Sequence, residues 1–490
     1  MRTLKVDARI WLLLILCVGF ALRAFFFVGM TQWDDFCYTQ VAYNVADGKF
    51  SFSEGLLYSA FRMGLILPTA LSFKLFGVNE YATELWPLLC SLGSIVLIFC
   101  LGRLLFDQKT GLLAAFLLSF FPLNVVYATL LLPDVIQPFF FALSAVFFFR
   151  AEKAEAPKSA WFNFFISGVI AGAAFWIRES SYMILLVYMV YLIYSRSLRK
   201  EQLAIVVGLL TVFAFDLLFY FWKVGNPLLH LQVLFDTANI TPGSFSWRIR
   251  HFFSTRFDFY QIYMSNGIFM FFSFFIFIST IYLLTKKDKK AYPPIIWFLT
   301  LFSYLEFMWP LHSRKLDRYL SILTIPTLLV LAQFLSTVGR EWKDRWKGRL
   351  FLLTVLSVLL PTSLAVARNL SHHYRNYTAD CKAAAHFLKT LPAREIYLPD
   401  ERLYVPGTKI PVPGGPLWLC RFNFYLAYET GYDCFGTAEE NRNSILRTLE
   451  GVENTQLQDA YVVIDSDAGV PYYWQELKEL GDVTVYYTAE

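Results

Sequence analysis

Residues 10–38, IWLLLILCVGFALRAFFFVGMTQWDDFCY, decide the fold, because a long apolar run in them ends almost directly at two adjacent carboxylates. The apolar part, 10–29, has the length of about 20 residues that a helix needs to cross the hydrocarbon core of a bilayer. It is too long for a signal-peptide core, and aromatic Phe25, Phe26 and Phe27 stand where a cleavage site would need small residues. The stretch therefore predicts a retained transmembrane helix with an acidic pair just beyond its end.

The rest of the chain has the same apolar character. Of its 490 residues 57% are hydrophobic and only 17% are charged, against about 25% charged in an ordinary soluble domain. Such a chain could not cover its surface with polar groups in water, which excludes a soluble enzyme, a disordered regulator and a secreted disulfide scaffold. The seven cysteines form no CxxC pair and no cluster with zinc spacing, so we expect no metal site built on sulfur.

The apolar runs predict an α-helical polytopic membrane protein with about eleven transmembrane helices. The predicted spans are 10–29, 84–106, 110–128, 133–150, 161–177, 180–195, 203–222, 266–285, 293–310, 319–338 and 350–367. Together they make up a membrane domain over residues 1–371. No internal repeat is visible, which disfavours the inverted halves common in transporters.

Every second linker between these runs is short and basic, which is typical of cytoplasmic loops. We therefore expect a multi-pass protein of the cell (inner) membrane with a cytoplasmic N-terminus. Residues 372–490 carry 10 Lys and Arg against 17 Asp and Glu, and eleven spans place this acidic region on the extracytoplasmic side. The surplus basic residues lie between spans, so no nucleic acid partner is expected.

Two outer loops are large, 30–83 and 223–265. In the first, 40–50 predicts a short amphipathic helix, and 61–77 predicts a second, juxtamembrane helix that Arg62, Pro68 and Lys74 interrupt too often for a span. Region 372–490 predicts a small α/β domain, because helical and strand patterns alternate along it. Its predicted helices are 381–391 and 474–480, and its predicted strands are 395–399, 460–465 and 483–487.

The acidic candidates follow the outer ends of spans. Asp34 and Asp35, with Tyr38 nearby, could supply a general base and a neighbour that binds an ammonium, a sugar hydroxyl or a metal, or they could form a solvated turn. Asp134 could cap the helix that follows Pro133, or it could add a second carboxylate to a site at the outer surface. A divalent cation remains an open alternative beside the expectation that no cofactor is required.

Basic candidates lie on the same predicted side. Arg178 and Glu179 fall between two spans, where an anionic ligand or an internal ion pair would suit them equally. Guanidinium groups bind phosphate well because their planar fork makes bidentate contacts, although contact with lipid headgroups would explain the same residues. The basic and polar candidates on outer linkers are Arg62, His312, Arg314, Lys315, Arg318 and Tyr319.

Three motifs give the chain a family resemblance. A basic stub and one span lead to Asp34, Asp35, Tyr38 and Ala42; FRMGLILPTALSFKLFG follows at 61–77; and Arg318-Tyr319 precedes Pro326. In this order they resemble the membrane-embedded C-class glycosyltransferases (GT-C), closest to the protein O-mannosyltransferase and aminoarabinose transferase superfamily. The resemblance covers about residues 8–370, and it departs at Asp35, where the commoner residue is Glu.

The resemblance implies a GT-C-like fold and an inverting sugar transfer from a polyprenyl-phosphate donor on the extracytoplasmic face. The acceptor would be a hydroxyl of a protein, lipid or glycan. It further implies that Asp34 is the catalytic acid residue with Asp35 in support, and that Arg62 and Arg318 bind the donor phosphate. Arg178 and Arg314 are added on charge and placement alone. The alternatives are a transporter or flippase of lipid-linked sugars and a noncatalytic envelope-assembly subunit.

Overall fold

The computed structural model describes residues 7–31, 33–50, 52, 58–240, 270–308, 317–342, 345–376, 379–392, 394–398, 446–448, 459–465, 474–480 and 483–488. The chain divides into two compact units. Unit 1 contains residues 1–27, 61–65 and 86–370, and unit 2 contains 28–60, 66–85 and 371–490.

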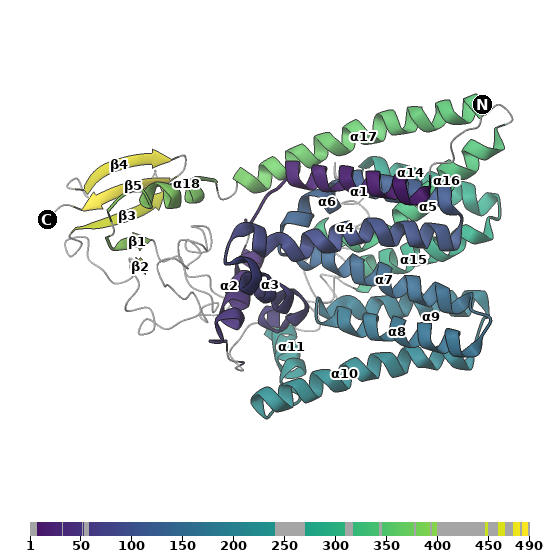
Figure 1. The fold of residues 1–490 in the computed structure, drawn as a ribbon, viewed down its shortest axis with the longest axis horizontal. Helices are drawn as coiled ribbons and strands as arrows, with labels where there is room; N and C mark the ends of the chain where they lie inside the picture. The colour runs from purple at the N-terminus through teal and green to yellow at the C-terminus, as the bar shows by residue number, and fades with distance from the viewer. Residues whose placement is uncertain are drawn as a thin grey trace. The chain divides into compact units, whose positions relative to one another are not determined.

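Unit 1 is a bundle of helices, and its long members lie side by side in Figure 1. Its helices are α1 (Ala8–Phe25), α4 (Glu80–Leu105, from Trp86 on), α5 (Gln108–Phe120), α6 (Pro122–Val126), α7 (Pro133–Glu152), α8 (Pro157–Phe175), α9 (Met183–Ser195), α10 (Leu203–Val224), α11 (Leu229–Ile240), α14 (Met270–Thr285), α15 (Tyr292–Ser303), α16 (Thr324–Glu341) and α17 (Arg345–Asn376). Short 3-10 turns η2 (Tyr127–Thr129), η3 (Glu179–Tyr182), η4 (Lys200–Gln202), η5 (Lys289–Ala291) and η8 (Asp317–Leu323) and the π-helical turn η6 (Tyr304–Met308) complete it.

Six helical segments in the described part of the chain are long and apolar enough to cross a membrane: Ala8–Phe25, Glu80–Leu105, Pro133–Glu152, Lys200–Val224, Arg318–Glu341 and Trp346–Asn376. A seventh span, predicted as continuous over 110–128, is bent by 65° where Pro122 follows α5, because proline cannot continue the hydrogen-bond ladder of the preceding helix. Other predicted spans correspond to shorter apolar helices, among them η3 with α9 and the last part of α14. The predicted helical, multi-pass membrane fold is confirmed.

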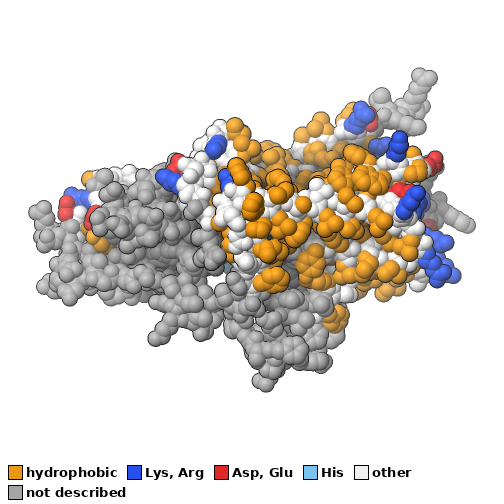
Figure 2. All heavy atoms as spheres, turned by 90° about the horizontal axis from the view of Figure 1, so that it is seen from below, with side chains coloured by type: hydrophobic (Ala, Val, Ile, Leu, Met, Phe, Trp, Pro, Cys, Tyr) orange, Lys and Arg blue, Asp and Glu red, His pale blue; other side chains and the backbone are white. Residues whose placement is uncertain are grey.

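The helices of the bundle differ in how much of their surface is buried, as expected for a protein embedded in lipid. Helices α7 and α16 are mostly buried in its interior, whereas α1, α10 and α17 leave large apolar side chains such as Trp11, Leu218 and Leu353 exposed. Figure 2 shows one face of the molecule, on which orange apolar side chains cover the flank of the bundle and blue lysines and arginines gather at one end. Apolar side chains therefore cover the surface between the ends.

Close packing of α8 on α10 depends on glycine. A Cβ at Gly168 would lie 2.1 Å from the carbonyl oxygen of Ile205, and one at Gly208 would lie 2.3 Å from that of Phe165. Small residues are what let two membrane helices bring their backbones together. This contact fixes α10 against the helix that leads into the polar segment 176–182.

Unit 2 contains α2 (Trp33–Asp47), most of α3 (Met63–Phe76) and a C-terminal sheet with α18 (Ala379–Leu388). The strands are β1 (Ile396–Leu398), β2 (Leu446–Thr448), β3 (Ala460–Asp465), β4 (Trp474–Leu480) and β5 (Val483–Thr488), in the order β2-β1-β3-β5-β4. Pairs β1–β2 and β1–β3 are parallel, and β3–β5 and β4–β5 are antiparallel. The predicted strands at 395–399, 460–465 and 483–487 are confirmed.

The prediction of a helix over 474–480 is wrong, because this segment is strand β4. Leu477 and Leu480 are spaced like the apolar face of a helix, yet both pack on the core of unit 2 as parts of a strand. An irregularity between Glu476 and Lys478 shifts the register against β5. Such a bulge inverts the alternation of side chains, so residues three apart can share one face.

The core of unit 2 joins residues far apart in the sequence. Met30, Phe36 and Cys37 lie in one buried cluster with Ala384, Leu388, Ile396 and Val485 and their neighbours. The helix predicted over 40–50 begins earlier, at Trp33, so both carboxylates of the acidic pair stand in the first turn of α2. That position suits them, since negative charge is favoured at a helix N-terminus.

Candidate functional site

The two carboxylates of the acidic pair have different surroundings within unit 2. Asp35 is fully buried, and its carboxylate accepts hydrogen bonds from the backbone N–H of Thr31 at 2.8 Å and of Phe36 at 2.9 Å. Asp34 is partly exposed. The predicted solvated turn is thus wrong for Asp35, which fixes the start of α2, and Asp34 is the more accessible of the two.

The thiol of Cys37, in the same turn, is affected by both carboxylates. Burial raises its pKa, and the negative charges of Asp34 and Asp35 raise it further. Cys37 is a free cysteine in the hydrophobic cluster. A neutral, buried thiol is a packing residue and not a nucleophile.

A further acidic residue lies near the pair. Glu84 is 1% exposed, and neither of its carboxylate oxygens has a hydrogen-bond partner in the described part of the chain. Asp35 and Glu80 are close enough to act on it electrostatically, and Glu80 forms a 2.7 Å ion pair with Lys382 on α18. The sequence analysis did not identify Glu84, because it lies at the start of an apolar run.

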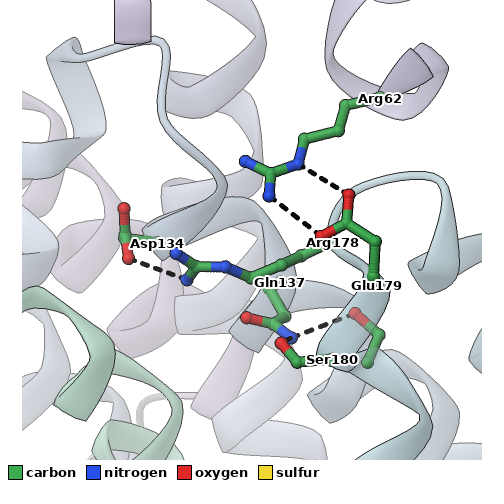
Figure 3. A network of polar contacts seen from close by, with 7 residues as sticks. Arg62, Asp134, Gln137, Arg178, Glu179 and Ser180 are labelled. Atoms are coloured by element: carbon green, nitrogen blue, oxygen red, sulfur yellow. Dashed lines mark hydrogen bonds and ion pairs between the residues drawn. The ribbon is translucent and has the colours of Figure 1, made fainter. Parts of the chain in front are cut away.

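Unit 1 contains the second polar constellation, drawn in Figure 3. Arg62 makes a two-bonded contact with Glu179, from Nε at 3.0 Å and from Nη2 at 2.9 Å. Arg178 donates from Nη1 to Asp134 Oδ1 at 3.1 Å. Arg178 and Glu179 thus both form ion pairs, each with a partner on another element.

These ion pairs are buried. The Arg178 and Asp134 side chains are 7% and 0% exposed, and those of Arg62 and Glu179 are 8% and 16%. Glu179 accepts both hydrogen bonds of Arg62 and carries the opposite charge. It therefore holds the Arg62 guanidinium in place.

Asp134 is not a helix cap. Helix α7 has Leu132 at its N-cap without a side-chain hydrogen bond, and Asp134 instead meets Arg178. Its other oxygen, Oδ2, is buried without a partner in the described residues, as is Oε1 of Gln137 one turn later. The amide of Gln137 donates to Ser181 at 3.0 Å and to Ser180 at 3.3 Å. Two acceptors in this network thus remain for a donor group.

Tyr319 brings the arginines of this network together. The guanidinium carbon of Arg178 lies 4.4 Å from the centroid of its ring, and that of Arg318 lies 5.7 Å from it. Three guanidinium groups and two carboxylates, those of Asp134 and Glu179, therefore make up the constellation. It carries one net positive charge, which is what an anionic group would require.

The segment 61–65 places Arg62. Gly64 donates its N–H to the carbonyl oxygen of Trp176 at 3.0 Å, and its own carbonyl accepts from Trp86 Nε1 at 3.0 Å. A Cβ at Gly64 would lie 2.3 Å from Ile177 and 3.1 Å from the Trp176 backbone. Glycine is thus required for the approach that brings Arg62 to Glu179.

Other predicted residues have simpler outcomes. Tyr38 is buried in unit 2 at 1% exposure. His312, Arg314 and Lys315 lie outside the described residues. The described residues hold no group of three or more His, Cys, Asp or Glu side chains arranged for a metal ion.

The structure adds a pair that the sequence analysis missed. His230 Nδ1 lies 3.1 Å from Asp216 Oδ1, and both side chains are 4% exposed. Asp216 interrupts the apolar α10, and a lone carboxylate within an apolar span was a signal for a partner.

The sequence of this chain is similar to those of known proteins. Residues 66–222 match the family model of dolichyl-phosphate-mannose-protein mannosyltransferases. An uncharacterised protein of Aquifex aeolicus is 26% identical over 298 residues, which are 59% of this chain and 55% of that protein. The chain thus spans about half the length of the curated relative that it matches.

Solved structures match over nearly the whole chain. ArnT from Cupriavidus metallidurans superimposes in its apo state with a TM-score of 0.65 at 14% identity, over 98% of both chains. Its form bound to undecaprenyl phosphate gives 0.63 at 13% identity, over 99% of both. An oligosaccharyltransferase of Archaeoglobus fulgidus gives 0.54 at 13% identity, over 98% of this chain and 73% of that one. The chain has the fold of these membrane proteins, and its resemblance to the C-class glycosyltransferases of the O-mannosyltransferase and aminoarabinose transferase superfamily is confirmed.

Proposed function

We propose that this protein is an inverting glycosyltransferase that moves a sugar from a polyprenyl-phosphate donor to a hydroxyl of a protein, lipid or glycan. The observation that carries the proposal is the constellation of Arg62, Arg178 and Arg318, whose charges exceed those of Asp134 and Glu179 by one. It stands in a chain that has the fold of an ArnT whose structure was solved with undecaprenyl phosphate. A lipid-linked phosphate is the anion that such a membrane protein would meet.

In this proposal Arg178 and Arg318 bind the departing lipid phosphate, and Arg62 contributes its positive charge to the same site. Glu179 and Asp134 hold the guanidinium groups of Arg62 and Arg178 in fixed orientations, and a guanidinium held in this way suits the oxygens of a phosphate. Guanidinium contacts neutralise the charge that develops as the bond to the sugar breaks. Arg314 and His312 stay candidates for the same role.

Asp34 is proposed as the base. The acceptor hydroxyl attacks the anomeric carbon, its proton passes to a carboxylate, and the lipid phosphate leaves with the bonding electrons. Asp34 is exposed enough to meet a substrate, whereas the oxygens of Asp35 are occupied by backbone N–H groups. Asp35 therefore serves to hold the turn.

The experiment separates binding from transfer. Purified protein in nanodiscs is incubated with a panel of polyprenyl-phosphate sugars, and hydrolysis or transfer is scored beside equilibrium binding of undecaprenyl phosphate. Asp34→Asn keeps the shape of the side chain but removes its basicity. It should bind the lipid normally and lose about 10²–10⁴ in turnover.

Two controls accompany this test. Glu201→Gln, a change of the same kind on η4, should leave turnover unaffected because the proposal gives Glu201 no role. Asp35→Asn should lower thermal stability, since its oxygens hold two backbone N–H groups. Normal turnover of Asp34→Asn would refute its assignment as the base.

No cofactor is proposed. We expect turnover to survive dialysis against EDTA, because the proposed transfer needs only a carboxylate base and guanidinium groups. Loss of activity with EDTA and recovery with one divalent cation would instead support a cation held by the acidic pair.

Two alternatives predict other results. A flippase would move lipid-linked sugars between leaflets of a vesicle and form no product. A noncatalytic assembly subunit would tolerate Asp34→Asn in cells without loss.

A further inference from the structure

His230 is a buried histidine at the start of α11 that the proposed reaction does not use. The side chain is 4% exposed, and so is that of its partner Asp216 on α10. Nδ1 lies 3.1 Å and 3.3 Å from the two carboxylate oxygens. A substrate could not reach a ring so buried, and the pair is therefore not a catalytic dyad.

Three aromatic rings surround the imidazole. Phe61 is stacked on it, with centroids 5.8 Å apart and planes 14° apart. Phe175 lies at 5.3 Å and Tyr220 at 5.5 Å, and Tyr220 also contacts Phe61 at 5.7 Å. These rings come from the 3-10 turn η1 (Tyr58–Phe61), from α8 and from α10, so His230 joins three elements to its own helix.

One of these rings belongs to the residue before Arg62. Phe61 is 1% exposed, so the backbone at the base of Arg62 is held on one side by the imidazole cluster. On the other side it is held by the hydrogen bond from Gly64 to Trp176. The guanidinium of Arg62 must meet Glu179 through two bonds, and such a contact requires its backbone to be fixed.

We propose that His230 is a positioning residue for Arg62: held by Asp216, its ring fixes Phe61 and so sets the guanidinium for the phosphate of the lipid donor. This inference rests on the proposed function. It gives the segment after α10 a role in donor affinity, although no residue of that segment needs to touch the donor.

The pair also explains how a carboxylate is tolerated within α10. Asp216 lies in an apolar helix where an unpaired charge would be costly. Replacing His230 alone would leave that charge buried and could prevent folding. The test therefore removes both polar groups together and varies only whether an aromatic ring remains.

Two double variants are compared in the full-length protein. Asp216→Leu with His230→Phe keeps a ring against Phe61, and Asp216→Leu with His230→Leu does not. The probe is undecaprenyl phosphate, titrated into protein in nanodiscs. The ring-free variant should raise its Kd about tenfold, and the ring-bearing variant should restore most of the affinity. Phe235→Leu, an exposed aromatic on the same helix, is the matched control and should leave Kd unchanged.

The decisive measurement repeats the ring-free change in an Arg62→Leu background. If His230 acts through Arg62, the ring-free change should raise Kd little further in the Arg62→Leu protein, because the effects of two residues that share one interaction are not additive. Full additivity of the two changes in Kd, or a ring-free variant with unchanged Kd, would overturn the inference.

A second variant covers the case in which the ring-free double variant fails to fold. Phe61→Leu removes the same ring stack from its other side and must show the same coupling to Arg62→Leu. An unchanged Kd in Arg62→Leu alone would instead contradict the assignment of Arg62 to the donor phosphate. The failure of the proposed function is thus distinguished from the failure of the inference on His230.

Discussion

At the scale of single residues, the arginines and carboxylates of unit 1 form crossed pairs. The neighbours Arg178 and Glu179 do not pair with each other, and each instead binds a residue from another element. This arrangement ties α7, η3 and the segment 61–65 together through charge. It also fixes the orientation of the Arg62 and Arg178 guanidinium groups.

The sequence could nominate these residues but could not pair them. Asp134 and Arg178 are 44 positions apart, and Arg62 and Glu179 are 117 apart. Charges beside apolar runs mark sites near a membrane surface, and that signal identified all four. Their partners depend on which helix ends meet in the folded bundle. Asp216 and His230 were missed because each is single in its own segment.

Breaking one buried pair should be costly. Asp134→Leu leaves the Arg178 guanidinium buried without its carboxylate, and we expect a loss of about 3–5 kcal/mol in the free energy of unfolding. Removing both partners, with Asp134→Leu and Arg178→Met, should cost less because no charge is left uncompensated. Thermal unfolding of the purified variants measures both. An equal or larger loss in the double variant would contradict the ion pair.

The fork of Arg62 gives a second prediction at this scale. Lysine keeps the charge but cannot make the two-bonded contact with Glu179. Arg62→Lys should therefore recover only part of the affinity for undecaprenyl phosphate that Arg62→Leu loses. Titration of the three proteins ranks them, and a lysine variant equal to the parent would show that charge alone suffices.

At the scale of elements, apolar length predicted the helices well and their interruptions poorly. The run 110–128 looked continuous, yet Pro122 bends it. The same weakness affected 474–480, where the spacing of Leu477 and Leu480 imitates a helix. Pairing with β5 decides the strand, and Gly481-Asp482, a two-residue spacing typical of hairpins, was the local signal for it.

Contact between α8 and α10 supplies the element-scale prediction. Gly208→Leu must push the two backbones apart, since even a Cβ would lie 2.3 Å from the Phe165 carbonyl oxygen. We expect a strong loss of stability, and of donor affinity because α10 carries Asp216 and Tyr220. Gly339→Ala in α16 is the control, because among the described residues no atom beyond its own helix backbone and chain neighbours lies within 4 Å of the added Cβ. Thermal unfolding that ranks both variants alike would contradict the packing.

At the scale of the whole molecule, the basic residues of unit 1 indicate one orientation. Lys158, Arg196, Lys200 and Lys290, all exposed, lie on linkers that the positive-inside rule assigns to the cytoplasm. Each of these linkers is separated from the next by an even number of predicted spans. The orientation thus depends on a pattern repeated along the chain and not on one boundary.

We therefore predict that position 200 faces the cytoplasm and position 386 the opposite side. A variant without the seven native cysteines receives one new cysteine, either Lys200→Cys or His386→Cys, both at exposed positions. In intact cells a membrane-impermeant maleimide should label only the second, and both should be labelled after lysis. This follows because the sign of the linker charges sets the direction of insertion. Labelling of position 200 in intact cells would reverse the topology, and a donor phosphate on the extracytoplasmic face would then be untenable for Arg62 and Arg178.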